Sequence, residues 1–331
     1  MSVLVTGGAG YIGSHMVLAL RARGEDVVVV DNLSTGHRWA VPDDVTFIKA
    51  SVDDGEAVMR AIAAHGVDAI IHFAGSIVVP DSVSDPLGYY LNNTVRSRAL
   101  IEIAVETGVR NFIFSSTAAV YGMPAENPVF ENAALAPISP YGTSKMMTEM
   151  MLADTAAAHD ITYTALRYFN VAGADPQGRT GQSSPNATHL IKVAVQTALG
   201  QRPGMAVFGT DYDTRDGTCV RDYIHVSDLA RAHLDALDAL RAGGASKVLN
   251  CGYGSGFTVR EVIAAVEMAA GTKLKVSDAP RRAGDPPALV AGAEAIRVQL
   301  GWTPQYDDLD TIVGHALSWE KALIKRQSSA A

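Results

Sequence analysis

The first half of the chain alternates short continuous apolar runs with longer segments of helical periodicity. The apolar runs are rich in Val, Ile and Phe, as is typical of strands buried on both faces of a parallel sheet. Between them, apolar positions recur every three to four residues, as in amphipathic helices. We expect strands over 3–6, 27–30, 45–49, 69–72, 112–115 and 163–166, and helices over 11–22, 54–64, 87–107 and 141–157. This alternation predicts an α/β fold with a Rossmann-type, doubly wound parallel sheet.

The pattern changes after residue 169, where Gly and Pro become frequent. We expect a helix over 188–199, a strand over 205–208, and a strand, helix and strand over 220–226, 228–240 and 247–250 that return to the sheet. Residues 256–269, 273–277 and from 281 onward are expected to form a smaller C-terminal α/β lobe. The prediction is a Rossmann domain over 1–169, completed by elements from about 220–250, interleaved with a substrate-binding lobe over most of 170–331.

Three glycines, Gly7, Gly10 and Gly13, are spaced three apart between the first expected strand and helix. In such a loop the first allows a tight turn, the second lets the backbone approach a pyrophosphate, and the third lets helix and sheet pack closely. The helix N-terminus then offers free N–H groups to the phosphates. Asp31 ends the second expected strand, where a carboxylate can accept from both ribose hydroxyls and repels a 2′-phosphate. We therefore predict NAD over NADP, although Arg38 nearby could serve a phosphate.

Tyr141 and Lys145 lie four residues apart and so on one face of the expected helix. A nearby ammonium favours the ionised phenol and can lower its pKa of about 10 by roughly 1–3 units. Such a phenolate could take a proton from a sugar or alcohol hydroxyl near neutral pH. The same spacing also arises by chance on solvated helices, so its weight comes from the dinucleotide loop. Together the two features indicate proton removal coupled to hydride transfer.

Composition narrows the class of protein. The chain has 331 residues, 48% of them hydrophobic and 19% charged, with a net charge of −8. This is typical of a soluble globular protein, and it argues against nucleic acid or anionic membranes as partners. Two cysteines, Cys219 and Cys251, cannot build a disulfide framework or a cysteine zinc site. No run approaches the roughly 18 apolar residues of a membrane helix and no leader is evident, so we expect a cytoplasmic protein. We predict no metal, since metal-hydrolase motifs are absent from the sequence.

The glycine loop, the Tyr141/Lys145 pair and the run Ser115-Ser116-Thr117 together resemble the extended short-chain dehydrogenase/reductase family. Within it, the chain from residue 1 to about 317 is similar to the UDP-glucose 4-epimerases (UDP-galactose 4-epimerases). The narrower resemblance rests on the segments His72-Phe-Ala-Gly75, Val120-Tyr-Gly122, Leu166-Arg-Tyr-Phe-Asn170, Val220-Arg-Asp-Tyr-Ile-His-Val226 and Arg281-Arg-Ala-Gly-Asp285. It implies reversible epimerisation at C4 of a UDP-sugar, between UDP-glucose and UDP-galactose, through a 4-keto intermediate with tightly bound NAD.

The resemblance also implies roles for individual residues. Tyr141 would remove the 4-hydroxyl proton directly or through Thr117, and Lys145 would lower the pKa of Tyr141 and bind the nicotinamide ribose. Cofactor contacts are implied for Gly7, Gly10, Tyr11, Ile12, Gly13, Asp31, Asn32, Leu33, Ser34, Thr35, Gly36, Ser51, Val52, Phe73, Ala74, Gly75, Asn93, Ser115, Tyr141, Lys145 and Phe169. Substrate contacts are implied for Thr117, Tyr141, Asn170, His189, Leu190, Ala206, Val207, Phe208, Arg221, Arg282, Asp285 and Leu289.

Each substrate residue has the chemistry for its role and also an ordinary structural alternative. Arg221 and Arg282 can fork onto diphosphate oxygens, and Asp285 can accept from a ribose hydroxyl. Phe208 can lie against uracil or be part of a core. Arg282 beside Arg281 can equally be a solvated basic pair, and His189 a satisfied helix histidine.

The chain departs from the family pattern at three positions. Ile77 replaces a lysine that reaches the cofactor phosphates, and Ser51 replaces a carboxylate that contacts the adenine amino group. The sequence therefore leaves open how tightly this chain retains NAD. Leu289 stands where some members carry a tyrosine, and the smaller side chain leaves room for an N-acetylated sugar. UDP-N-acetylhexosamines and UDP-xylose/UDP-arabinose thus remain alternative substrates.

The motifs also distinguish this chain from other functions on the same fold. A 4,6-dehydratase needs an acid and a base after the Ser/Thr, where this chain has Ala118 and Ala119. A net dehydrogenase or reductase, and a non-catalytic NAD-binding regulator, are less consistent with the motifs. Methionines at 146, 147, 150 and 151 suggest an adaptable helix contact. Similar enzymes dimerise through this helix and the one over 87–107, so a homodimer is expected.

Overall fold

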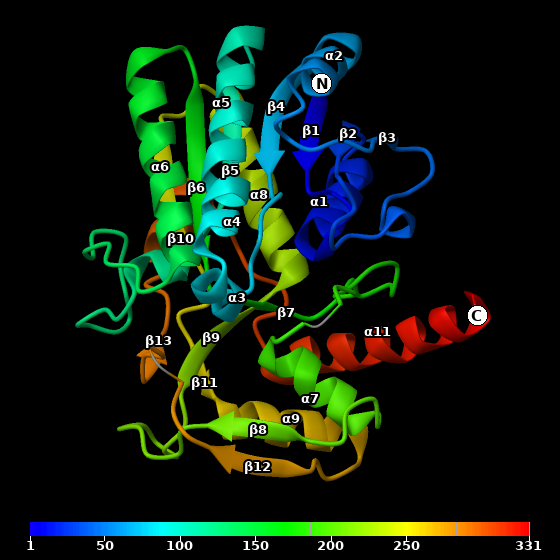
Figure 1. Ribbon diagram of the computed structural model, residues 1–331, viewed down its shortest axis with the longest axis vertical. Helices are drawn as coiled ribbons and strands as arrows, with labels where there is room; N and C mark the ends of the chain where they lie inside the picture. The colour runs from blue at the N-terminus through cyan, green and yellow to red at the C-terminus, as the bar shows by residue number, and fades with distance from the viewer. Residues whose placement is uncertain (186, 283, 331) are drawn as a thin grey trace.

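The computed structural model describes residues 1–185, 187–282 and 284–330, with side chains as far as residue 328. Its main layer is a seven-stranded parallel sheet in the order β10-β6-β5-β4-β1-β2-β3 (Figure 1). The strands are β1 (Ser2–Thr6), β2 (Asp26–Val30), β3 (Thr46–Ile48), β4 (Val67–His72), β5 (Asn111–Thr117), β6 (Thr162–Tyr168) and β10 (Lys247–Cys251). The chain winds outward from β1 in both directions, so the predicted doubly wound α/β fold is confirmed. In such sheets ligands bind beside the carboxyl ends of the strands where the order reverses.

Helices cover both faces of this sheet. Helices α1 (Tyr11–Ala22) and α8 (Val226–Arg241) pack on one face, where Met16, Leu20 and Leu237 lie fully buried against β1 and β2. Helices α2 (Gly55–His65), α5 (Arg96–Thr107) and α6 (Pro140–Ala158) cover the other. A strand pattern that is apolar on both faces requires this arrangement, because each face must be shielded from water.

The helix expected over 87–107 is present and runs without a break from residue 86 to residue 107. It consists of α4 (Pro86–Tyr89), a π-helical segment (Tyr90–Val95) and α5, and a separate short helix, α3 (Val79–Ser84), precedes it. Pro86 starts α4, and Asp85 caps it by accepting from the Gly88 N–H at 3.0 Å. Short π segments are often found at functional sites, and this one carries Asn92 and Asn93.

The second half builds a smaller lobe. One sheet has the order β11 (Gly256–Thr258), β9 (Val220–His225), β13 (Ala288–Leu289), with β7 (Asn170–Ala172) also paired to β9. A second sheet pairs β8 (Met205–Phe208) with β12 (Val276–Ala279). Of the three elements expected to return to the main sheet, α8 packs on it and β10 joins it, but β9 pairs within the small sheet. The cause is that an apolar strand pattern does not encode its neighbour. The strand expected over 273–277 is also shifted, to β12.

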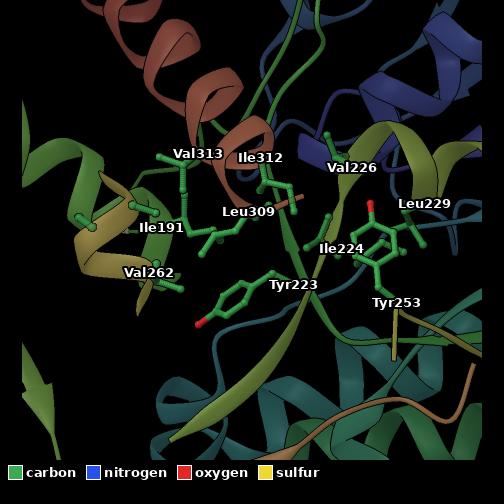
Figure 2. Packing of buried hydrophobic residues seen from close by; sticks show 14 of the residues in the cluster. Ile191, Tyr223, Ile224, Val226, Leu229, Tyr253, Val262, Leu309, Ile312 and Val313 are labelled. Atoms are coloured by element: carbon green, nitrogen blue, oxygen red, sulfur yellow. The ribbon is translucent and has the colours of Figure 1, made fainter. Parts of the chain in front are cut away.

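Three helices pack against the small lobe, namely α7 (Leu190–Ala198), α9 (Val259–Ala270) and α11 (Leu309–Ala330), while α10 (Glu294–Leu300) packs beside β10. Their apolar side chains meet those of β9 in one cluster. Figure 2 shows Ile191 of α7 beside Leu309 and Val313 of α11, with Ile224 of β9 close by. Within the described residues, no helix is both long enough and apolar enough to cross a membrane.

Candidate active site

A cleft of about 780 Å³ runs along the carboxyl ends of β1 to β6 and reaches the small lobe. One wall holds the glycine loop and the segments that follow β2, β3 and β4. The other holds residues from 182–189, Arg221 on β9, and the segment from Gly284 to Leu289. Thr117, Tyr141 and Lys145 lie between the two walls. Most of the residues predicted from the sequence therefore line one continuous space.

The glycine loop has the geometry of a phosphate cradle. Gly7 has a φ of +69°, and a Cβ added there would lie 2.7 Å from the backbone nitrogen of Ala74. A Cβ added at Gly13 would lie 2.2 Å from the carbonyl oxygen of Gly7, so this glycine is required by the loop itself. Gly10 precedes α1 and has no side chain with which to cap it. The first N–H groups of α1 therefore stay open to an anion, and this cradle fits a dinucleotide pyrophosphate.

Asp31 links the glycine loop to the loop after β2. Its Oδ2 accepts from the Ala9 N–H at 2.9 Å, and its Oδ1 accepts from the Leu33 N–H at 2.7 Å. Each carboxylate oxygen keeps a further lone pair, so ribose hydroxyls can still donate to it. The predicted role of Asp31 is compatible with this geometry, and the backbone contacts fix the direction of the carboxylate.

Tyr141 and Lys145 project from the first turns of α6. Ser139 caps this helix by accepting from the Gly142 N–H at 3.2 Å, and Pro140 occupies its first position. The Lys145 ammonium is buried, lies 4.9 Å from the centre of the Phe114 ring, and donates to the Ser115 carbonyl at 3.0 Å. This places the ammonium at the end of β5, close to Thr117.

The electrostatics of this pair differ from the sequence expectation. Burial raises the pKa of Tyr141, and a hydrogen bond with Thr117 only partly opposes the rise. Burial also lowers the pKa of Lys145 to about 8. In the protein alone the pKa of Tyr141 is set mainly by desolvation of the phenolate, and the effect of Lys145 on it stays a prediction.

Asn93 serves the architecture of the site. Its Oδ1 accepts from the Ser76 N–H at 2.7 Å, and its Nδ2 donates to the Ser76 carbonyl at 2.9 Å and to the Ser144 hydroxyl at 3.1 Å. These contacts tie the loop after β4 to α6. The side chain is buried and is not among the residues that line the cleft, so these contacts give it a positioning role, and its cofactor contact stays a prediction.

On the substrate side, Arg221 and Asp285 form an ion pair at the cleft, and both line it. His189 lines it as well, and its Nδ1 lies 2.8 Å from Gln182 Nε2. Because an amide nitrogen only donates, Nδ1 accepts and Nε2 of His189 keeps its proton. Leu289 lines the cleft and packs against a cluster that includes Ala118, and Ala119 and Gly122 line the cleft as well.

Several residues predicted as contacts lie outside the cleft lining: Leu33, Asn93, Leu190, Ala206, Val207, Phe208 and Arg282. Leu33 packs toward the core under α1 and α8, and Leu190 packs against the core of the small lobe. Val207 is buried on β8. The Arg282 guanidinium lies 3.8 Å over the Phe208 ring, so these two side chains satisfy each other. The ligand contacts of these residues stay predictions, since proximity in sequence to a motif does not determine which way a side chain points.

Sequence reasoning also missed part of the lining. The segment that holds Gln182, Ser184, Pro185 and Thr188 lines the cleft, as do Ile138 and Tyr168. The Tyr168 hydroxyl hydrogen-bonds the Ser115 hydroxyl. Tyr168 could have been found, since it lies within the motif Leu166-Arg-Tyr-Phe-Asn170. The loop residues carry no pattern that distinguishes them from an ordinary surface loop.

Comparison with known proteins gives consistent matches over nearly the whole chain. The model of the NAD dependent epimerase/dehydratase family matches residues 3–252. The UDP-glucose 4-epimerase of Azospirillum brasilense is 57% identical over 97% of this chain and 92% of its own length. The crystal structure of UDP-glucose 4-epimerase from Brucella ovis in complex with NAD is 44% identical, with a TM-score of 0.93 over 96% of this chain and 97% of that one. The UDP-Glc/GlcNAc 4-epimerase of Campylobacter jejuni is 48% identical, with a TM-score of 0.86 over 97% and 99%.

Proposed function

The chain belongs to the NAD dependent epimerase/dehydratase family, and we propose that it interconverts UDP-glucose and UDP-galactose at C4 of the sugar with NAD as its bound cofactor. The observation that carries this proposal is the position of Thr117, Tyr141 and Lys145. They lie in one cleft between a dinucleotide cradle and an arginine-carboxylate pair on the small lobe. A phenolic base between a cofactor site and an anion site is what a redox epimerase of nucleotide sugars requires.

Thr117 and Tyr141 provide the proton path. The Thr117 Oγ1 accepts from the Ala119 N–H at 3.1 Å, so its own proton is free to be donated to the Tyr141 oxygen. That donation stabilises the phenolate and lowers the pKa of Tyr141. A sugar 4-hydroxyl can therefore lose its proton to Tyr141 directly or through Thr117. The same path in reverse protonates the epimeric hydroxyl.

Lys145 orients the reaction. One of its three ammonium protons is donated to the Ser115 carbonyl, and the other two can be donated to the nicotinamide ribose and the phenolate. A bound NAD supplies reversible acceptance of the C4 hydride, so that the sugar passes through a 4-keto form. The residues proposed to hold NAD are the glycine loop, Asp31 and the segments after β3 and β4 that line the cleft.

The small lobe holds the nucleotide and leaves the sugar free to turn. Arg221, whose side chain is 11% exposed, presents its guanidinium to the diphosphate, with Asp285 fixing its direction. The sugar end of the lining is built from Ala118, Ala119, Gly122 and Leu289, and these side chains offer few hydrogen bonds to hold one face of the ring. The same alanines argue against a 4,6-dehydratase, because methyl groups cannot transfer the protons of a water elimination.

A second candidate substrate is the N-acetylated pair, UDP-N-acetylglucosamine and UDP-N-acetylgalactosamine. It is favoured by Leu289, which lines the cleft with a smaller side chain than tyrosine. Leu289→Tyr should reduce turnover of the N-acetylated pair much more than that of UDP-glucose. Negligible native turnover of UDP-N-acetylglucosamine beside rapid turnover of UDP-glucose would remove this candidate.

The proposed assembly is a homodimer. Large apolar side chains are exposed along the α4–α5 region and α6, namely Leu87 at 79%, Leu91 at 49%, Val95 at 53% and Met150 at 57%. Exposed apolar side chains gathered on two adjacent helices are typical of a protein interface. A second copy of the chain would cover both helices. A cytoplasmic location is proposed as well, since Cys219 and Cys251 are buried free thiols.

The direct test is incubation of the purified protein with UDP-galactose, with and without added NAD, followed by proton NMR. Formation of UDP-glucose at a nearly constant NADH level is the expected result. Tyr141→Phe is the matched control, because it keeps the buried ring and removes the base. Failure of the native protein on UDP-galactose, UDP-N-acetylgalactosamine and UDP-arabinose would overturn the proposed function. Net accumulation of NADH would instead indicate a dehydrogenase.

A further inference from the structure

A buried ion pair behind the cleft has no role in the chemistry proposed above. Lys192 of α7 and Glu320 of α11 form a salt bridge with side chains that are 6% and 1% exposed. The pair lies beside the apolar side chains of Ile191 and Val195, at the edge of the core of the small lobe. Replacing such a pair by apolar side chains of similar volume is often neutral or stabilising, because burial of two charges is costly. Stability of the helix contact alone therefore does not explain why charged residues occupy these positions.

The contacts of the pair lead to one end of the cleft wall that residues 182, 184–185 and 187–189 form. The Lys192 ammonium donates to the Gln182 carbonyl at 2.7 Å, and the Trp319 indole N–H donates to the same oxygen at 3.3 Å. A Cβ added at Gly181 would lie 2.4 Å from the Trp319 ring, so the chain lies directly against the indole there. Gln182 in turn donates to Nδ1 of His189.

A second branch from Glu320 reaches the other end of the same cleft wall. Gln196 donates to Oε1 of Glu320 at 3.3 Å, and Oε1 of Gln196 accepts from Arg202 Nε at 2.7 Å. Nη2 of Arg202 donates to the Ala187 carbonyl at 3.1 Å. Gln182, Ala187 and His189 all line the cleft. Glu320, on the C-terminal helix, is thus the shared end of two hydrogen-bonded chains that hold this cleft wall.

We propose that Glu320 and Lys192 are positioning residues for the nucleotide of the substrate: through Gln182 and Ala187 they hold the wall on which His189 presents its Nε2–H to the ligand. The contact of α11 with α7 that makes this possible is visible in Figure 1. The inference rests on the proposed function in naming a uridine nucleotide as the ligand. In this proposal the C-terminal helix α11 contributes to binding of the nucleotide and takes no part in the transfer of the proton or the hydride.

The test is the double variant Lys192→Met/Glu320→Met, which removes both charges together and keeps the side-chain volumes close. We expect its melting temperature to be equal to or above that of the native protein. We expect the Kd for UDP and the KM for the UDP-sugar to rise about tenfold, as for the loss of one or two anchoring hydrogen bonds. The kcat at saturating substrate should stay within about twofold.

A matched control separates positioning from stability. Leu317 is an apolar residue of α11 in the same core and outside the cleft. Leu317→Ala should lower the melting temperature and leave the Kd for UDP unchanged. A rise in Kd for this variant equal to that of the double variant would overturn the proposal, because looser helix packing would then be a sufficient cause.

Gln182→Leu tests the hydrogen bond from Gln182 to His189 and leaves the ion pair intact. If the double variant does not fold, this variant alone decides whether the cleft wall positions His189. It removes the donor to His189 and keeps the backbone carbonyl, so we expect a raised Kd for UDP with a native melting temperature. An unchanged Kd in this variant, or in a folded double variant, would overturn the inference. A native protein that binds no UDP would overturn the proposed function itself.

Discussion

The Thr117 hydroxyl accepts a hydrogen bond from the main-chain N–H of Ala119 at 3.1 Å, which turns its proton toward Tyr141. Thr117→Val keeps the shape of the side chain and removes that proton. We expect kcat to fall by roughly 100-fold, as for loss of one general acid-base group, with little change in the Kd for UDP. Steady-state kinetics and UDP titration measure the two quantities.

Thr117→Ser is the control for this prediction, since it keeps the hydroxyl and loses only a methyl group. It should retain activity within about fivefold of the native enzyme, a range that is small beside a lost acid-base group. Equal losses in the valine and serine variants would show that packing at position 117 matters more than its proton.

Lys145→Met should change the pH dependence of the reaction as well as its rate. Burial raises the pKa of Tyr141, and the predicted role of the buried Lys145 ammonium is to favour the phenolate against this rise. We therefore expect kcat to be lower by about 100-fold or more at pH 7 and to keep rising with pH beyond the native plateau. A variant whose kcat follows the native pH profile would contradict a role for Lys145 in ionising Tyr141.

Stability should fall on mild acidification because of buried neutral histidines. Burial lowers the pKa of His72 and of His225 to about 3, from the ordinary value of 6.5. Below pH 6.5 these histidines bind protons in the unfolded chain but stay neutral in the folded protein. Their contribution to the free energy of unfolding is therefore present above pH 6.5 and is lost as the pH falls toward 3. Each histidine contributes a slope of up to about 1.4 kcal/mol per pH unit. Urea unfolding at pH 7, 6, 5 and 4.5 measures it.

His72→Gln provides the comparison. His72 is held between the Thr6 hydroxyl at 2.6 Å and the Ser97 hydroxyl at 2.8 Å, and a glutamine amide can bond to both without titrating. The variant should be less stable at pH 7. Between pH 6.5 and 4.5 its free energy of unfolding should fall less steeply with pH, by the slope that uptake of about one proton contributes. The same slope in both proteins would indicate that other groups dominate acid unfolding.

The glycine loop, Asp31 and the Tyr141/Lys145 pair were predictable because their function is encoded in local spacing. A loop between a strand and a helix, or two residues one helical turn apart, needs no knowledge of the rest of the fold. The doubly wound sheet followed for the same reason, since strands apolar on both faces alternate with helices. The family resemblance extended this to Arg221 and Asp285, which do meet at the cleft.

What the sequence did not yield depends on tertiary packing. Strand β9 resembles a strand of the main sheet but pairs with β11, β13 and β7. Gln182 and Ala187 line the cleft because Lys192, Trp319 and Arg202 hold their carbonyl oxygens, and backbone carbonyls leave no trace in a sequence pattern. The raised pKa of Tyr141 likewise depends on burial, which the Tyr–Lys spacing alone does not report.

The proposed homodimer can be broken by charge at its surface. Leu87→Glu/Met150→Glu places two carboxylates among the exposed apolar side chains of α4 and α6. We expect a dimeric native protein and a monomeric variant in sedimentation velocity runs, because desolvating a carboxylate at an interface is unfavourable. Met268→Glu/Val298→Glu is the control, since these residues are 77% and 83% exposed and lie on α9 and α10. A monomeric control variant, or a dimeric test variant, would exclude the proposed helices as the interface.

Cofactor retention should respond to a single charge at position 77. Ile77 follows β4, lines the cleft and is 48% exposed, so a longer polar side chain has room there. Ile77→Lys should add a charge-assisted hydrogen bond to the cofactor phosphates, worth about 1.5–3 kcal/mol. That corresponds to NAD dissociation roughly 10- to 150-fold slower than in the native protein. The NAD that remains bound after gel filtration, or its rate of loss on dilution, measures the effect. Ile77→Met lengthens the side chain without charge and should leave the dissociation rate unchanged, so slower loss in both variants would assign the gain to packing.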